Sequence, residues 1–584
     1  MRIDRRGLIA GAAGLAAMAR PLDALAARKP REDRPAGIDA YLDRLQTFGF
    51  SGALFAVENG RTAFHRELGW ADKGLGVRFS RYTPFNIASI TKTFTAAAVM
   101  RLVEEGVVAL DDPLRRFFPD APEDKAAITL AQLLSHSSGL ERQVLRGKEP
   151  LTREDATAQI LGSKLGAAPG ERFTYSNEGF RLLAAVVEVA SKRSFRTVVD
   201  EEIFTPAGMA NSGFAQDYRT RATIARGCNE WKALASFREE QNPGWYEGAG
   251  NIVSTAVDLE RYVTALEAGA IVRPDSLAQM FAPHSPPTGM GGVEGYGYGW
   301  YSAKPETSPP FVFHGGDNPG YHSELRWYPS TRRWAFVIAT REAYDDSGAG
   351  VATYKSGIVR DVVRYREDVP VDAPPEVTAV RRDVERRLAG RWVAGDGVIE
   401  FKRLDPSDQH LTVIATGQPA ADALVGGDPE LEKRLAAANA RTLRLAEAIA
   451  REDAEALKPL LGDLGFFIKG WLADFAAWRQ ASGAFQGLGR PTSRPTPFGT
   501  DQIRTHLTFR FEKAAVVLEF TWNGEELYET ISETGAPSSV VLPMATAGDQ
   551  TLVTYDFVTR RIVGVRIDSR DSIVVGSTRF QLQA

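Results

Sequence analysis

The chain has 584 residues with a formal net charge of −4, and 43% of them are hydrophobic, a composition typical of a large globular protein with two or three domains. Because the sequence has no long basic block, nucleic acid is not an expected partner. Cys228 is the only cysteine and none of the seven histidines has another histidine four residues away, so the sequence offers no disulfide pair and no expected metal site.

Residues 1–27 are expected to be a signal peptide. Arg5-Arg6 directly precedes the apolar run 7–19, which is typical of a twin-arginine export signal, although Asp4 stands where such signals usually carry Ser or Thr. An ordinary secretory signal or an uncleaved membrane anchor is the alternative. We therefore expect a periplasmic or secreted bacterial protein. No stable membrane span is expected in the mature chain, because no other stretch approaches the ~20 apolar residues that a span requires.

Residues 28–365 are expected to form one domain that begins and ends with strands. SGALFAVE (51–58) and RTAFHRELGWA (61–71) flank an Asn59-Gly60 turn and predict a β-hairpin. Distant strands on either side of a helical centre predict an α+β fold, in which helices flank an antiparallel sheet. After the hairpin, helices are predicted over 89–106, 130–140 and 180–193, strands over 310–316, 322–329 and 334–340, and a last helix over 348–365.

Residues 366–384 are predicted to be a linker, because the segment 366–377 is rich in proline and acidic residues and lacks apolar periodicity. Residues 385–584 are predicted to form a β-rich α+β accessory domain, with a helical insertion over 430–461, an irregular loop over 491–500 and a closing β-meander. His410 and His506 are interpreted as surface or core residues, so we expect a lid or scaffold role for this domain.

The motif Ser89-Ile90-Thr91-Lys92 lies at the start of the first predicted helix. Residues three apart share a helix face, so the Ser89 hydroxyl and the Lys92 amine can come within hydrogen-bond distance as a nucleophile and its base. About one such match is expected by chance in a chain of this length, and an N-capping serine with a solvated lysine is the alternative. The motif therefore needs partners elsewhere in the chain.

Two further motifs provide such partners. Tyr175 and Asn177 lie in a loop before a predicted helix, where a tyrosine near cationic groups can act as base and then acid, and an amide can orient a lysine. His314-Gly315-Gly316 lies on a predicted strand, where missing side chains allow a substrate backbone to lie against the strand edge. A bulge or turn is the alternative for this third motif.

The ordered motifs Ser-x-x-Lys, Tyr-x-Asn and His-x-Gly resemble those of the serine β-lactamase-related family, in particular its class C-like branch of penicillin-binding proteins, esterases, D-aminopeptidases and carboxypeptidases. The resemblance covers about residues 50–341 and includes four connecting segments. It implies a beta-lactamase/transpeptidase-like fold and a serine hydrolase that needs no metal or organic cofactor. The connecting segments are LLSHSSGL (133–140), GAGNIVSTAVDLERY (248–262), GYGYGW (295–300) and PGYHSELRWYP (319–329).

The resemblance also implies a role for each motif residue. Ser89 would attack a carbonyl carbon to form an acyl-enzyme, which water then hydrolyses, while Lys92 and Tyr175 handle the proton. How Lys92 and Tyr175 divide the base role stays open. The backbone N–H groups of Ser89 and Asp317 would hold the oxyanion. The implied substrate-binding residues are Asn177, His314, Gly315, Gly316 and Asp317.

The third motif differs from the Lys-Thr-Gly that β-lactamases usually carry. Lysine and hydroxyl groups there help to bind a substrate carboxylate, so His314 and Gly315 favour neutral esters, amides or D-amino-acid peptides over β-lactams. The expected function is an acyl-enzyme serine hydrolase acting on an ester, amide or D-amino-acid peptide bond of a small-molecule or peptide substrate. A non-catalytic penicillin-binding-like sensor and a D-Ala-D-Ala carboxypeptidase are the alternatives.

Overall fold

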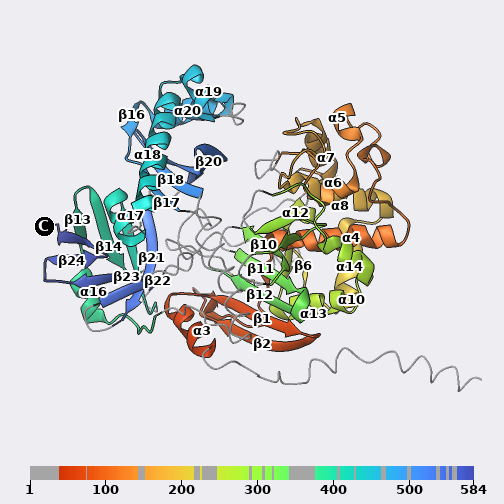
Figure 1. The fold of residues 1–584 in the computed structure, drawn as a ribbon, viewed down its shortest axis with the longest axis horizontal. Helices are drawn as coiled ribbons and strands as arrows, with labels where there is room; N and C mark the ends of the chain where they lie inside the picture. The colour runs from red at the N-terminus through yellow and green to blue at the C-terminus, as the bar shows by residue number, and fades with distance from the viewer. Residues whose placement is uncertain are drawn as a thin grey trace, which may run out of the picture.

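The structure is a computed structural model, and the part of the chain that it describes contains a helix-covered sheet, a closed barrel and a smaller sheet with its own helices (Figure 1). The expected signal peptide, the helix predicted over 348–365 and Cys228 lie outside the described residues. The described residues are 38–73, 75–141, 151–215, 224–225, 246–288, 292–305, 309–318, 321–340, 375–403, 408–425, 429–461, 468–495, 502–534, 539–547, 551–555 and 562–583.

The first sheet has seven antiparallel strands in the order β2-β1-β12-β11-β10-β9-β8. The first strand, β1, pairs with the last, β12, so segments far apart in the chain close the sheet, and the predicted α+β fold is confirmed. Asn59 and Gly60 both have positive φ, 49° and 70°, as a two-residue hairpin turn requires. The strands are β1 Gly52–Glu58, β2 Arg61–Leu68, β8 Val293–Tyr296, β9 Tyr301–Ala303, β10 Phe311–Asn318, β11 Tyr321–Tyr328 and β12 Arg333–Ala339.

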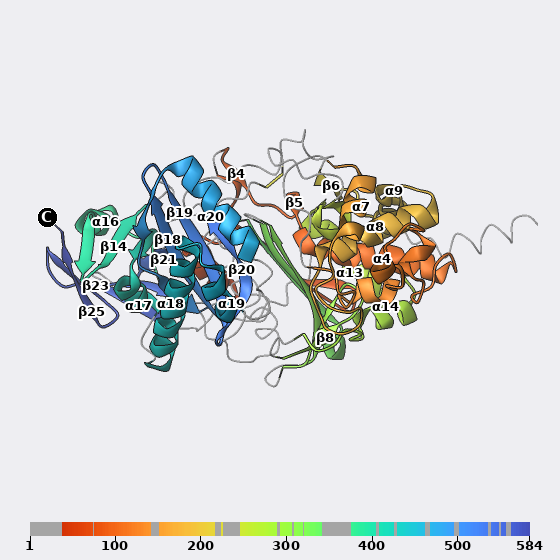
Figure 2. The ribbon, with the colours of Figure 1, turned by 90° about the horizontal axis from the view of Figure 1, so that it is seen from above.

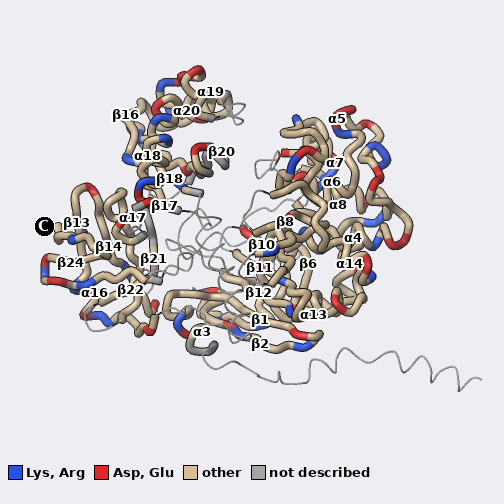
Figure 3. The backbone as a smooth tube through the Cα atoms, in the orientation of Figure 1, with Lys and Arg blue, Asp and Glu red and all other residues tan. Residues whose placement is uncertain are grey.

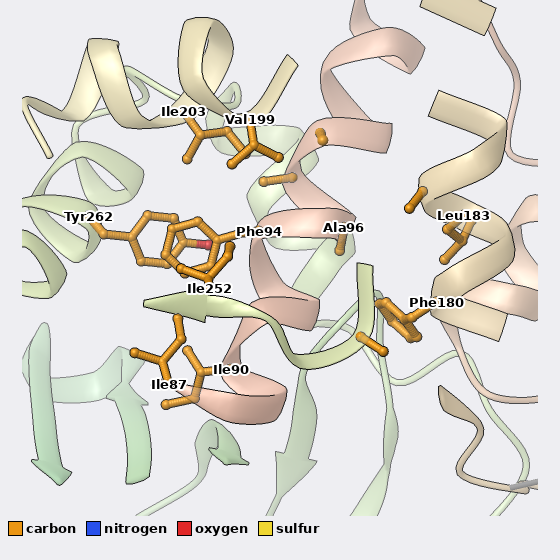
Figure 4. Packing of buried hydrophobic residues seen from close by; sticks show 14 of the residues in the cluster. Ile87, Ile90, Phe94, Ala96, Phe180, Leu183, Val199, Ile203, Ile252 and Tyr262 are labelled. Carbon is orange, nitrogen blue, oxygen red and sulfur yellow. The ribbon is translucent and has the colours of Figure 1, made fainter. Parts of the chain in front are cut away.

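Helices gather on one side of this sheet, and α4 runs through the middle of them (Figures 1 and 2). Phe94 of α4 stacks on Tyr262 with ring centroids 4.0 Å apart, and Figure 4 shows further apolar side chains around the same helix. Apolar packing in the core therefore fixes the position of the first turns of α4. The longer helices here are α4 Thr91–Glu104, α7 Arg153–Gly162, α8 Asn177–Ser191, α13 Ala256–Glu267 and α14 Pro274–Phe281; shorter ones include α6 Leu130–Leu134, α9 Phe195–Val199 and α12 Glu247–Gly250.

The helix predicted over 130–140 is shorter than expected. The α6 helix ends at Leu134, and the capping box of Thr129 and Gln132 fixes its start. His136 and Gly139 then take positive φ values of 56° and 78°, which a right-handed helix does not accommodate. The prediction was wrong over its second half because the apolar spacing of the segment gives no sign of this left-handed turn.

The sheet is apolar on both faces. In β1, Phe55 and Val57 belong to the helix-side core, whereas the alternate residues Leu54 and Ala56 belong to a second apolar cluster. This second cluster also contains residues of α3 (Ile38–Thr47) and of the barrel, among them Trp392. The barrel is therefore packed against the outer face of the sheet rather than tethered loosely to it.

The barrel closes through eight strands in the order β13-β14-β15-β21-β22-β23-β24-β25. Between β15 and β21 the described chain leaves the barrel: the helix Gln418–Val425 packs on the barrel, and three further helices accompany a second sheet at the upper left of Figure 1. The barrel strands are β13 Arg391–Ala394, β14 Gly397–Lys402, β15 Leu411–Thr416, β21 Ser539–Thr546, β22 Thr551–Tyr555, β23 Ile562–Ile567, β24 Ser572–Val575 and β25 Thr578–Leu582. The inserted elements are α17 Gln418–Val425, α18 Pro429–Ala450, α19 Ala454–Leu461, α20 Ile468–Ser482, β16 Phe485–Leu488, β17 Thr492–Pro495, β18 Gln502–Phe511, β19 Ala515–Asn523 and β20 Glu526–Thr534.

Three local predictions for this half of the chain need correction. The expected closing meander is split, because β18 to β20 belong to the inserted sheet and β21 to β25 to the barrel. The expected loop over 491–500 begins with a strand, β17, which pairs with β18. The α16 helix (Arg382–Leu388) starts inside the segment predicted as a linker, because Val384 and Leu388 bury their side chains in the barrel cluster.

Neither histidine of this region is at the surface. His410 is buried, and His506 is buried with its Nε2 2.9 Å from Glu519 Oε2. Lys and Arg are interspersed with Asp and Glu along the described chain (Figure 3). Among the described helices, none combines the length and the apolar character needed to cross a bilayer.

Candidate active site

Ser89 lies in a short 3-10 turn, Ala88–Ile90, immediately before α4. Ala88 has a φ of 47°, so the chain makes a strained left-handed step just before the serine. The side chain of Ser89 is half-buried, whereas its neighbours Ala88 and Ile90 are buried. The turn therefore presents one hydroxyl at the start of a rigid helix.

Lys92, one turn further on, is fully buried. Its Nζ lies 3.0 Å from Ser89 Oγ and donates to Asn177 Oδ1 at 2.8 Å and to the Ala249 carbonyl at 2.7 Å. The Asn177 Oδ1 and the Ala249 carbonyl oxygen can only accept hydrogen bonds, so each of them takes one N–H group of Nζ. The third tetrahedral position of Nζ then faces Ser89. A neutral lysine has its lone pair in this position, and a protonated lysine has its third N–H there.

Tyr175 and Asn177 flank the N-cap of α8. Ser176 caps this helix, and its Oγ accepts a hydrogen bond from the Gly179 N–H at 3.3 Å. Asn177 is the first residue of the helix, and its side chain accepts a hydrogen bond from Lys92. Tyr175 is half-buried, with its ring centroid 5.0 Å from Lys92 Nζ. The structure thus brings four of the predicted residues, Ser89, Lys92, Tyr175 and Asn177, into one cluster.

The third motif lies on β10 beside the 3-10 turn. A Cβ placed on Gly316 would be only 2.2 Å from the Ile87 carbonyl oxygen, so glycine is what allows this close approach. The β9 strand pairs with β10 only as far as Phe313. Among the described strands, residues 314–318 of β10 pair with β11 on one edge, and no strand pairs with them on the other edge. Asp317 follows Gly316 with its Oδ1 2.9 Å from His322 Nδ1. A strand edge of this kind can pair with an extended backbone.

The side chain of His314 is buried and makes two polar contacts. Its Nδ1 lies 2.6 Å from the Gly315 carbonyl oxygen, which accepts only, and its Nε2 lies 2.8 Å from the Tyr296 hydroxyl. Burial, followed by the neighbours Tyr175 and Tyr301, raises the pKa of Tyr296 well above its usual value, so that hydroxyl stays protonated and can donate to Nε2 of a neutral imidazole. A neutral imidazole satisfies both contacts, unlike the cationic lysine of the Lys-Thr-Gly motif.

Sequence reasoning missed three groups of this site: the Ala249 carbonyl, the Tyr296 hydroxyl and the His136 ring, which lies 4.4 Å from the Tyr175 ring between centroids. All three residues lie in the connecting segments of the family resemblance. The sequence therefore marked these segments, but it did not indicate which groups in them contact the site. Among the described residues, no group of three or more His, Cys, Asp and Glu side chains is arranged to hold a metal ion.

Comparison with known proteins identifies the family. The Beta-lactamase family matches residues 38–357, more than half of the chain. The putative penicillin-binding protein PbpX of Bacillus subtilis is 28% identical over 271 residues, which cover 46% of this chain and 66% of that protein. The D-alanyl-D-alanine-carboxypeptidase/endopeptidase AmpH of Escherichia coli K12 is 29% identical over 332 residues, covering 52% of this chain and 83% of AmpH.

One solved structure resembles almost the whole molecule. The octameric penicillin-binding protein homologue from Pyrococcus abyssi matches with a TM-score of 0.50 and covers 93% of this chain and 98% of its own. Its sequence identity is 18%, so this likeness concerns the fold alone. The match of the family over the sheet and its helices is what decides membership: the chain belongs to the beta-lactamase family of serine hydrolases.

Proposed function

We propose that this protein hydrolyses ester or amide bonds, including D-amino-acid peptide bonds, through an acyl-enzyme on Ser89. The observation that carries the proposal is the position of Lys92 Nζ, 3.0 Å from Ser89 Oγ. Lys92 is fully buried, so bulk water does not compete for this contact. Two acceptors fix its orientation, so its third position is directed at the hydroxyl that must be activated.

The proposed reaction begins when Ser89 Oγ attacks the carbonyl carbon and its proton passes to the Lys92–Tyr175 pair. The two residues share this proton. Tyr175 then protonates the leaving group, and water attacks the acyl-enzyme with the same groups acting as base. The N–H groups of Ser89 and Asp317 would stabilise the oxyanion, a contribution of ~3 kcal/mol per donor in comparable sites.

The environment of His314 supports a neutral substrate. An uncharged imidazole can make its contacts with the Gly315 carbonyl and the Tyr296 hydroxyl, and an uncharged ring supplies no counter-ion for a substrate carboxylate. Esters, amides and peptides approached at an internal bond meet this condition. The similarity to AmpH, a D-alanyl-D-alanine carboxypeptidase and endopeptidase, supports D-amino-acid peptides in particular and keeps a carboxypeptidase as the second candidate. We propose a periplasmic or secreted location on the N-terminal arginines and apolar run.

We propose that the domain after residue 385 is a scaffold. It shares one apolar cluster with the outer face of the catalytic sheet, and Lys73 Nζ lies 2.5 Å from Asp408 Oδ1. The apolar cluster joins the barrel to the sheet that carries β10, whereas the Lys73–Asp408 pair joins the barrel side to the turn after Trp70–Asp72, a strand of a separate two-stranded sheet. A domain held in this way supports the site from behind the sheet.

The test is covalent labelling of the purified protein with a fluorophosphonate or a fluorescent penicillin. Wild type and Ser163→Ala, a serine at the end of α7, are expected to be labelled, and Ser89→Ala is not. Lys92→Ala is expected to abolish turnover of p-nitrophenyl acetate, whereas a binding or sensor protein would not turn it over at all. Equal labelling of Ser89→Ala and wild type would show that Ser89 is not the nucleophile. D-alanine p-nitroanilide and nitrocefin then separate the peptidase and β-lactamase branches.

A further inference from the structure

His136 accepts hydrogen bonds from the backbone on both sides of Tyr175. The Thr174 N–H donates to the His136 carbonyl oxygen at 2.8 Å, and the Ser176 N–H donates to His136 Nδ1 at 3.1 Å. Thr174 and Ser176 are the two chain neighbours of Tyr175. One residue therefore holds the backbone on both sides of the proposed acid–base group.

The conformation of His136 makes this double contact possible. Its φ of 56° is left-handed, so its carbonyl and its side chain both reach the same short loop. The ring is buried, and its centroid lies 4.4 Å from that of Tyr175, 4.5 Å from that of Tyr296 and 5.0 Å from that of Phe180. The Tyr175 ring thus packs against a buried ring that is surrounded by further aromatic rings.

The ring of His136 is neutral. Because Nδ1 accepts a hydrogen bond, the proton of a neutral imidazole is on Nε2, which is buried without a hydrogen-bond partner among the described residues and lies among aromatic rings. Burial is the largest cause that lowers the pKa of His136 well below its usual value, and Lys92 and His314 lower it further whenever they are protonated. A neutral ring adds no positive charge beside Lys92.

We propose that His136 is a positioning residue for catalysis: it sets the distance of Tyr175 from Lys92 and Ser89 through its Nδ1 and carbonyl acceptors. This inference rests on the proposed hydrolase function. Reactions that depend on a positioned acid or base lose about 10²-fold when the group moves by 1 Å. A loss of the Nδ1 acceptor releases one side of the loop while leaving the nucleophile and Lys92 in place.

The experiment compares His136→Asn with His136→Ala in p-nitrophenyl acetate hydrolysis. Asparagine carries Oδ1 where histidine carries Nδ1 and tolerates positive φ, so kcat is expected within about threefold of wild type. Alanine has no acceptor, and kcat is expected to fall ~10- to 100-fold with KM nearly unchanged. Lys192→Ala is the matched control, since Lys192 has a φ of 57° at the end of α8 without contact to the site.

Two results would overturn the proposal: a folded His136→Ala variant with wild-type kcat, or an Asn variant that loses as much kcat as the Ala variant. Should His136→Ala fail to fold by thermal melting, His136→Gly takes its place, because glycine is unstrained at this φ. Fluorophosphonate labelling of Ser89 is expected to persist in all these variants. Failure of the positioning role and failure of the hydrolase proposal are therefore distinguishable.

Discussion

Replacing Gly316 by alanine tests the close approach between β10 and the turn that carries Ser89. The added Cβ would lie 2.2 Å from the Ile87 carbonyl oxygen and 2.6 Å from Ser323 Oγ. A carbon and a carbonyl oxygen normally stay roughly 3.3 Å apart, so backbone must move by about 1 Å. Because the obstacle is main chain, a rotamer change does not relieve it. The proposed oxyanion donors, Ser89 N–H and Asp317 N–H, lie on the two segments that separate.

A separation of about 1 Å predicts a ~10²-fold fall in kcat, equivalent to ~2.7 kcal/mol of transition-state stabilisation. The overpacking itself is expected to lower the free energy of unfolding by about 1–3 kcal/mol. The assay is the rate of acylation under single-turnover conditions, with thermal melting to confirm folding. Gly162→Ala is the control, since nothing lies within 4 Å of the position of its added Cβ. A folded Gly316→Ala variant that acylates within twofold of wild type would refute the reasoning.

Three further predictions follow from individual contacts. Asn177→Ala removes one acceptor of Lys92 Nζ and is expected to lower kcat ~10-fold in steady-state assays, more than it changes KM. Lys73→Met leaves the buried Asp408 carboxylate without its lysine and is expected to lower the free energy of unfolding by ~1–2 kcal/mol, measured by urea denaturation. The folded-state pKa of His136 lies below the ordinary value near 6.5, so the unfolded chain binds more protons below that pH and acidification destabilises the fold. Its share of the slope is at most ~1.4 kcal/mol per pH unit, and His136→Asn should remove it from urea titrations at pH 7 and 5.5.

Local sequence patterns determined much of the catalytic region. The Asn59-Gly60 turn, alternating strands and apolar helices are each specified by neighbouring residues, so β1, β2, α4 and α8 occur close to where periodicity places them. Ser89 and Lys92 are three residues apart, and their contact follows from helix geometry alone. The contact between Lys92 and Asn177 joins residues that are 85 positions apart, and motif order indicated it only through the family resemblance.

Other features were decided by tertiary structure. The strands near the C-terminus look alike in sequence, yet β18 to β20 pair among themselves and β21 to β25 return to β13 to close a barrel, because pairing partners depend on which distant edges remain open. The roles of His136 and of the Ala249 carbonyl likewise depend on which loops meet around Lys92. Sequence by itself thus determined the short-range elements and the chemical groups, since these follow from local periodicity and side-chain type. Only the tertiary structure decided what each group touches, because those contacts join segments that the sequence leaves far apart.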